Sequence, residues 1–160
     1  MLVFKDATRK TIVKVCDFGY STLAASEGGS VLLPKSRPWN APEHHFGEFK
    51  VSPAKKADVY SFGMLCLWLL FGSVRVAQNG TDSMPELVSF DASTGPRTWL
   101  ECLKDEDKLQ NLATQLLALT ELNTELSIRL KGFFDMTIPL NPEKRTPDLG
   151  KLLHLLSNER

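Results

Sequence analysis

The segment that most constrains the fold is ADVYSFGMLCLWLLF, at residues 57–71. It is helical in length, and its second half is apolar on every face. A helix without a polar face must be buried on all sides, so we expect residues 57–71 to form the central helix of the fold. Gly72 is placed to end this helix, and Gly63 inside it predicts close packing against a neighbouring element.

Two short β-rich runs precede this helix. Leu2–Phe4 and Thr11–Cys16 flank the polar segment KDATRK, a pattern typical of a short hairpin. From Gly19 to about Asn40 no period holds, and glycine, serine and proline recur. A loop of this length in a compact domain is usually functional or mobile, so residues 19–40 are the first indication of a regulated site.

Apolar spacing predicts three more helices after an irregular segment at residues 73–98. The first carries leucines three and four residues apart over 109–119, and the second spans roughly Ser127 to Met136. The third begins with Thr146 as N-cap and Pro147 in its first turn. Its apolar face is expected to comprise Leu149, Leu152, Leu153 and Leu156. The prediction is a mainly α single domain with a short N-terminal β-hairpin and helices around a buried central helix.

Composition argues against several classes of function. The 160 residues carry 19 basic and 19 acidic side chains, so no net charge attracts nucleic acid or an anionic membrane. Cys16, Cys66 and Cys102 are widely spaced, which argues against a disulfide framework and a zinc site. The N-terminus lacks the apolar core of a signal peptide, and Phe62–Phe71 is too short to cross a bilayer. We expect a soluble, intracellular, cytoplasmic protein without an evident oligomer signal.

The tripeptide DFG at residues 17–19 follows directly after the second predicted strand. A carboxylate such as Asp17, just past the end of a strand, is a hard oxygen ligand that suits Mg²⁺ bound to nucleotide phosphates. Phe18 can pack inward, and Gly19 lets the backbone adopt alternative arrangements. Alone, the tripeptide is also compatible with a simple turn.

Three further motifs follow DFG in order. PWNAPE occupies residues 38–43, ADVYSFG opens the apolar helix at residues 57–63, and NPEKRTP lies at residues 141–147. In this order the four motifs resemble the C-terminal lobe of a protein kinase, in which DFG, an activation loop and APE belong to the signature set. The resemblance extends from about Leu2 to Leu156, and it is greatest to the tyrosine-kinase-like group, many of whose members phosphorylate Ser or Thr.

The resemblance implies a cofactor site and a substrate platform. Asp17 would be the metal ligand for the Mg²⁺ that bridges the ATP phosphates, with Phe18 and Gly19 beside it. The loop from residue 20 to residue 40 would be the activation segment. Pro38 and Trp39 would shape the platform that holds a protein substrate near its acceptor hydroxyl.

The resemblance also implies structural roles for five residues. Glu43 would pair with Arg145 across the lobe, and Asp58 would accept backbone N–H bonds from the catalytic loop. These two carboxylates and the guanidinium would hold the lobe together without touching substrate. Ala41 and Pro42 belong to the same APE motif. His44 and His45, which follow it, lack further ligands at metal-binding spacing and are interpreted as surface or packing residues.

A kinase needs parts that these 160 residues do not contain. No G-x-G-x-x-G occurs, and none of the three histidines is followed by Arg-Asp, so the H-R-D catalytic loop is missing. In the family this loop ends just before a strand like Leu2–Phe4. We therefore expect residues 1–160 to be a partial kinase domain, truncated just after the catalytic loop and without the catalytic aspartate.

Three hypotheses for function remain. In the first, the chain is the latter part of a full-length kinase that transfers the ATP γ-phosphate to protein Ser, Thr or Tyr hydroxyls. In the second, it is a catalytically dead kinase-derived lobe that binds protein partners. In the third, it is an unrelated helical interaction module with accidental motifs. We expect the chain alone to lack kinase activity and, because lobe surface would be exposed, to be poorly soluble.

Overall fold

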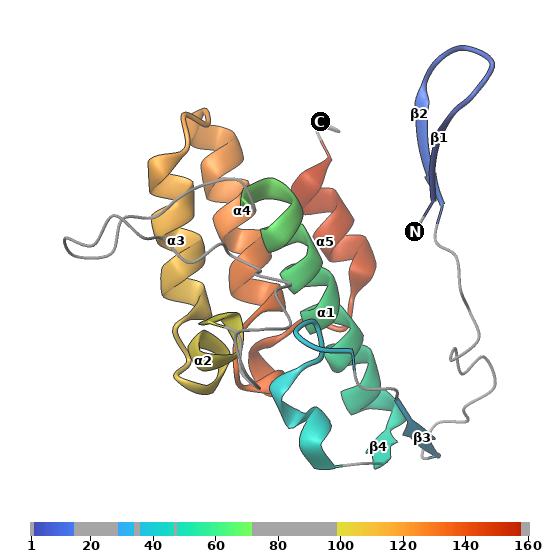
Figure 1. The fold of residues 1–160 in the computed structure, drawn as a ribbon, viewed down its shortest axis with the longest axis vertical. Helices are drawn as coiled ribbons and strands as arrows, with labels where there is room; N and C mark the ends of the chain where they lie inside the picture. The colour runs from blue at the N-terminus through green and yellow to red at the C-terminus, as the bar shows by residue number, and fades with distance from the viewer. Residues whose placement is uncertain (1, 15–28, 34–35, 47, 72–98, 158–160) are drawn as a thin grey trace.

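The computed structural model describes residues 2–14, 29–33, 36–46, 48–71 and 99–157. These residues form a mainly helical fold with two small antiparallel sheets (Figure 1). The helices are α1 (Val51–Phe71), α2 (Trp99–Asp105), α3 (Leu109–Leu119), α4 (Thr124–Thr137) and α5 (Leu149–Leu156), with two 3-10 helices, η1 (Pro42–Phe46) and η2 (Pro142–Lys144). The strands are β1 (Leu2–Lys5), β2 (Thr11–Lys14), β3 (Ser30–Leu32) and β4 (Glu48–Lys50).

The predicted N-terminal hairpin is confirmed as far as Lys14, where the description stops. β1 and β2 pair antiparallel, with Val3 opposite Val13. The Asp6 carboxylate closes the turn by accepting bonds from the backbone N–H groups of Thr8 and Lys10, and the Thr8 hydroxyl also donates to it. These bonds lower the pKa of Asp6. No side chain of residues 3–14 is buried, and the hairpin stands apart from the helices (Figure 1).

The stretch from Gly19 to Asn40 is not irregular throughout its described part. Ser30–Leu32 forms β3, which pairs with β4 so that Val31 lies opposite Phe49. Both of these side chains are buried and pack with Ala54 of α1 in a small second apolar cluster. A strand of three residues is too short to show alternation in the sequence, which explains why the prediction missed it.

The central helix is confirmed, but two of its predicted properties are wrong. α1 begins at Val51 rather than Ala57, with Pro53 in the first turn, where its missing N–H removes no helical hydrogen bond. The helix is also not buried on all sides, because Leu69 and Leu70 are exposed. Among the described residues, β3 and β4 cover Ala54, and the helices cover the face that carries Val59, Tyr60, Met64, Leu67 and Phe71, all of which are buried.

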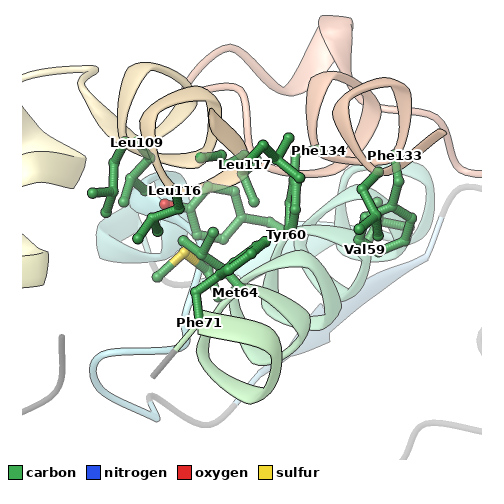
Figure 2. Close-up of a cluster of buried hydrophobic side chains, with 14 of the residues drawn as sticks. Val59, Tyr60, Met64, Phe71, Leu109, Leu116, Leu117, Phe133 and Phe134 are labelled. Atoms are coloured by element: carbon green, nitrogen blue, oxygen red, sulfur yellow. The ribbon is translucent and has the colours of Figure 1, made fainter. Parts of the chain in front are cut away.

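The main core lies where α1 meets α3 and α4. Figure 2 shows the ring of Tyr60 among Met64, Leu116 and Leu117, with Phe134 beside them. The close packing predicted at Gly63 is present: a Cβ there would lie 2.5 Å from Thr137 Oγ1 and 2.8 Å from Ile138 Cγ2. Glycine is therefore required for α1 to approach the C-terminal end of α4 this closely.

α3 and α4 form where the apolar spacing predicts them, but the residues that are buried differ in part from the predicted ones. In α3, Leu109, Leu112 and Leu116 are buried as expected, whereas Leu119 is exposed and Leu117 is buried in its place. α4 begins at Thr124, capped by Asn123, whose side chain accepts a hydrogen bond from Leu126 N. Ile128 in its second turn is exposed.

The last helix starts later than predicted. Its N-cap is Asp148, whose carboxylate accepts a hydrogen bond from Lys151 N, so the assignment of Thr146 as N-cap is wrong. The hydroxyl oxygen of Thr146 instead accepts a hydrogen bond from Asp148 N, which lies before the first residue of the helix. Of the predicted apolar face, Leu152 is buried, whereas Leu149 and Leu153 are 55% and 61% exposed. None of the described helices is long and apolar enough to cross a membrane.

Replacing Asp148 by alanine is expected to lower the free energy of unfolding by about 1 kcal/mol, because one first-turn N–H loses its acceptor. Thr146→Val, at the position the sequence favours as cap, is expected to cost less, since Thr146 Oγ1 accepts from Asp148 N, which precedes the first turn of the helix. Urea unfolding of the two variants checks the order. A larger loss for Thr146→Val would mean that the helix starts where the sequence suggests.

Candidate functional site

The described parts of three of the four motifs lie in or against α1. Residues 38–41 lead into η1, which contains Pro42 and Glu43, Asp58 lies in α1, and Arg145 follows η2. DFG, with Asp17, Phe18 and Gly19, lies outside the described residues. The site that can be built from the structure is therefore the platform and its supports, without the predicted cofactor turn.

Glu43 and Arg145 form a bidentate ion pair between segments 102 residues apart in the sequence. Arg145 Nη1 donates to Glu43 Oε1 at 2.6 Å, and Nη2 donates to Oε2 at 2.9 Å. The Arg145 side chain is 0% exposed and that of Glu43 is 18% exposed. Two parallel charge-assisted bonds in a site with little water fix both the distance and the orientation of the two segments. The structure thus brings together the two residues that the resemblance pairs.

The remaining donors of Arg145 bind main-chain oxygens of the chain around it. Nε donates to Pro139 O at 2.8 Å, Nη2 to Leu140 O at 2.9 Å, and Nη1 to Lys56 O at 3.3 Å. The guanidinium also lies 4.6 Å from the centroid of the Tyr60 ring. A buried charge is tolerated only when its hydrogen bonds are satisfied, and here one side chain links α1, η1 and the segment before η2.

The segment before Arg145 is held by local contacts. Asn141 caps η2 by accepting a bond from Glu143 N at 2.9 Å, and Pro142 occupies the first helical position. Glu143 in turn accepts a bond from Lys56 Nζ at 2.8 Å, which ties η2 to α1. The N-P-E sequence therefore sets the local turn, and the Lys56 contact sets where it docks.

The predicted platform residues lie in a tight turn against α1, formed by residues 36–40, which we call the platform turn. The backbone N–H groups of Trp39 and Asn40 both donate to Ser36 O, at 2.8 and 3.0 Å. Pro38 is buried, and the half-buried ring of Trp39 meets Trp68 of α1 edge to face, with centroids 5.8 Å apart. Ala41 is fully buried, and Pro42 begins η1.

Lys104 of α2 also binds this turn, which sequence reasoning missed. Its Nζ donates to Pro38 O at 2.8 Å and to Asn40 O at 2.5 Å. It also lies 5.5 Å from the Tyr60 ring centroid, so Tyr60 is flanked by two cations, Lys104 and Arg145. Burial raises the pKa of Tyr60, and its hydroxyl has no hydrogen-bond partner among the described residues.

Asp58 lies at the edge of an open apolar groove between α1 and α5. The groove has a volume of about 590 Å³, and it is lined by Lys55, Asp58, Val59, Phe62, Pro147, Asp148, Leu149 and Leu153. Burial raises the pKa of Asp58, and His44 opposes this effect. Within the described part of the chain, its carboxylate has neither a hydrogen bond nor an ion pair. The exposed leucines of α5 are thus explained as one wall of this groove.

The surroundings of His44 and Cys66 indicate packing roles for both side chains. His44 is buried, with Nε2 2.9 Å from Leu33 O and its ring edge-on to Phe49, so it is a packing residue. Burial raises the pKa of the Cys66 thiol to about 11, which leaves it unreactive near neutral pH. No three His, Cys, Asp or Glu side chains gather as metal ligands in the ranges that the structure describes. Asp17, the predicted Mg²⁺ ligand, lies outside these ranges.

Comparisons of the whole chain with protein-family models, curated proteins and solved structures found no match.

Proposed function

We propose that the chain is part of the C-terminal lobe of a protein kinase, which in its full-length context transfers the γ-phosphate of ATP to a protein hydroxyl. The bidentate Glu43–Arg145 pair carries this proposal. It joins the APE motif to the late arginine, two of the motifs from which the resemblance was drawn. A chance occurrence of both motifs would not require their side chains to meet in a buried pair.

Two further observations support the same proposal. Asp58 is exposed and its carboxylate has no partner among the described residues, so it is available to accept N–H bonds from another segment, such as the catalytic loop. Pro38 and Trp39 lie in a turn braced from two sides, by Lys104 and by Trp68, which suits a rigid surface for a peptide substrate. ATP and Mg²⁺ would be the cofactors, with Asp17 as a ligand.

The test is a phosphotransfer assay on the product that the cell makes. An antibody against residues 147–158 isolates that product, which is incubated with radiolabelled ATP, Mg²⁺ and a generic protein substrate. We expect phosphate transfer by a product heavier than 17.9 kDa, and none by the recombinant 160-residue chain. In the cellular product, Asp17→Ala is expected to reduce transfer by roughly 10³-fold, the scale on which lost electrostatic stabilisation acts.

The open groove favours a second function, a catalytically inactive lobe that binds a protein partner. Leu149 and Leu153 expose apolar surface of the kind found at interaction sites. The same assay separates the two functions. A product of 17.9 kDa without transfer would contradict the kinase function and support the interaction module. Transfer that survives Asp17→Ala would contradict the proposed role of Asp17 as the Mg²⁺ ligand.

A further inference from the structure

Lys104, which braces the turn that carries Pro38 and Trp39, is a buried lysine. It lies in α2, and only 6% of its surface is exposed. Lysine is almost never buried without a specific partner, because removing the ammonium group from water is costly. The partners here are two main-chain oxygens and an aromatic ring, contributed by segments 44 or more residues away in the sequence.

The two oxygens that Lys104 binds lie on either side of Trp39. They belong to Pro38, at 2.8 Å, and to Asn40, at 2.5 Å, so one ammonium group fixes the main chain before and after the tryptophan. On its other side, the Trp39 ring contacts Trp68. The orientation of Trp39 is therefore set by Lys104 through the backbone and by Trp68 through the ring.

We propose that Lys104 is a positioning residue for the substrate platform, which fixes the orientation in which Trp39 meets a protein substrate. The inference rests on the proposed function, because the platform role of Pro38 and Trp39 comes from the kinase resemblance. Lys104 acts through the two carbonyl groups and does not itself touch the substrate.

The protonation of Lys104 gives this contact a measurable signature. Burial lowers the pKa of Lys104 from 10.5 to about 8. A neutral amine still has two N–H donors, which match the two carbonyl acceptors. The charged side chains that act on Lys104 are Glu101 and Asp105 from its own helix, Glu43 from η1, and Arg37 from the platform turn. Arg37 opposes the charge on Lys104, and the three carboxylates favour it.

The direction of the pH effect follows from the lowered pKa. Between about 8 and 10.5, Lys104 is neutral when docked on the platform turn and charged when released into water. The released arrangement then binds more protons, so the docked arrangement gains as pH rises through this window. Below the window both arrangements are charged, and the cost of burying the ammonium group is fully present. The platform turn is therefore held more tightly at pH 9 than at pH 7.

The first test reads the Trp39–Trp68 pair by near-ultraviolet circular dichroism of the 160-residue chain. The signal is expected to change with a midpoint near pH 8 in the wild type. We expect no such transition in Trp39→Phe, which removes the reporter, or in Lys104→Met, which keeps the shape but not the donors. Lys131→Met, which removes a lysine from an exposed ion pair on α4, is the matched control and should retain the transition.

Two results would overturn the proposal: a wild-type signal that is flat across this range, or a transition that persists in Lys104→Met. If Lys104→Met does not fold, the comparison of the wild type with Trp39→Phe decides, because a transition that remains without Trp39 is not a motion of the platform turn.

The second test uses the active cellular product and separates substrate positioning from folding. Lys104→Met is expected to raise KM for the protein substrate by about tenfold while kcat changes little, since the platform binds substrate without joining the chemical step. A fall in kcat at constant KM would contradict the platform role. If the wild-type product has no activity, the proposed function and the platform role both fall, whereas the spectroscopic test still reports whether Lys104 controls Trp39.

Discussion

Replacement of Arg145 by leucine is expected to lower the free energy of unfolding by about 3–5 kcal/mol, the usual cost of removing one partner from a buried ion pair. The variant leaves the Glu43 carboxylate largely buried without its cation. It also removes the donors that bind the carbonyl groups of Pro139 and Leu140. Urea unfolding followed by far-ultraviolet circular dichroism measures the loss, and a loss this large leaves many small domains partly unfolded without urea.

Two controls define what this result means. Arg145→Lys keeps the charge but not the planar fork, so we expect an intermediate loss if bidentate geometry matters. Lys131→Ala breaks an exposed ion pair with Asp135 on the surface of α4, and it is expected to cost less than about 1 kcal/mol. Similar losses for Arg145→Leu and Lys131→Ala would contradict a central role for the Glu43–Arg145 pair.

The alanine substitutions of two helical glycines are expected to have opposite effects. At Gly63, the new methyl group would lie 2.5 Å from Thr137 Oγ1 and 2.6 Å from Thr137 Cβ, so α1 and α4 must move apart. Overpacking of this kind typically costs about 1–3 kcal/mol, and rigid helix-to-helix contact favours the upper end. At Gly132 in α4, a Cβ would meet nothing within 4 Å, and Gly132→Ala is expected to add about 0.5–1 kcal/mol through helix propensity.

The pair of glycine variants is its own control, because both replace a helical glycine by alanine. Thermal and urea unfolding are measured on each variant alone and on the double variant, whose effects we expect to add approximately. Thr137→Ala in the Gly63→Ala background removes the closest of the three contacts and is expected to recover part of the loss. A Gly63→Ala variant as stable as the wild type would mean that α1 and α4 are farther apart than described.

Sequence patterns predicted where the helices lie in the chain better than they predicted where each helix begins and which of its residues are buried. The apolar run at residues 57–71 identified α1, but the preceding residues, VSPAKK, have no apolar period that could reveal the earlier start. Leucine spacing shows which residues of α5 share a face, but not which part of that face packs against another element. Leu152 is buried, whereas Leu149 and Leu153 line a groove, because burial depends on the elements packed around a helix.

The two long-range contacts of the site differed in how well the sequence revealed them. The pairing of Glu43 with Arg145 is what the resemblance to a kinase lobe implies, because both residues belong to the motifs that carry it. Lys104 lies in a polar segment, CLKDEDK, where a lysine is normally an exposed residue. Its acceptors are backbone carbonyl groups, which every residue has, so no sequence pattern marks them. Only the tertiary arrangement brings α2 to the platform turn.

The exposed N-terminal hairpin has a consequence for how unfolding is observed. Residues 3–14 bury no side chain, so opening β1 and β2 sacrifices little apolar contact, and an isolated two-stranded hairpin is marginal in water. The amide protons of this ladder therefore exchange with deuterium through a low-energy local opening, whereas those in the middle of α1 and α4 need the whole helical body to come apart. Far-ultraviolet melting curves accordingly report the helical body, and the hairpin behaves as a separate cooperative unit.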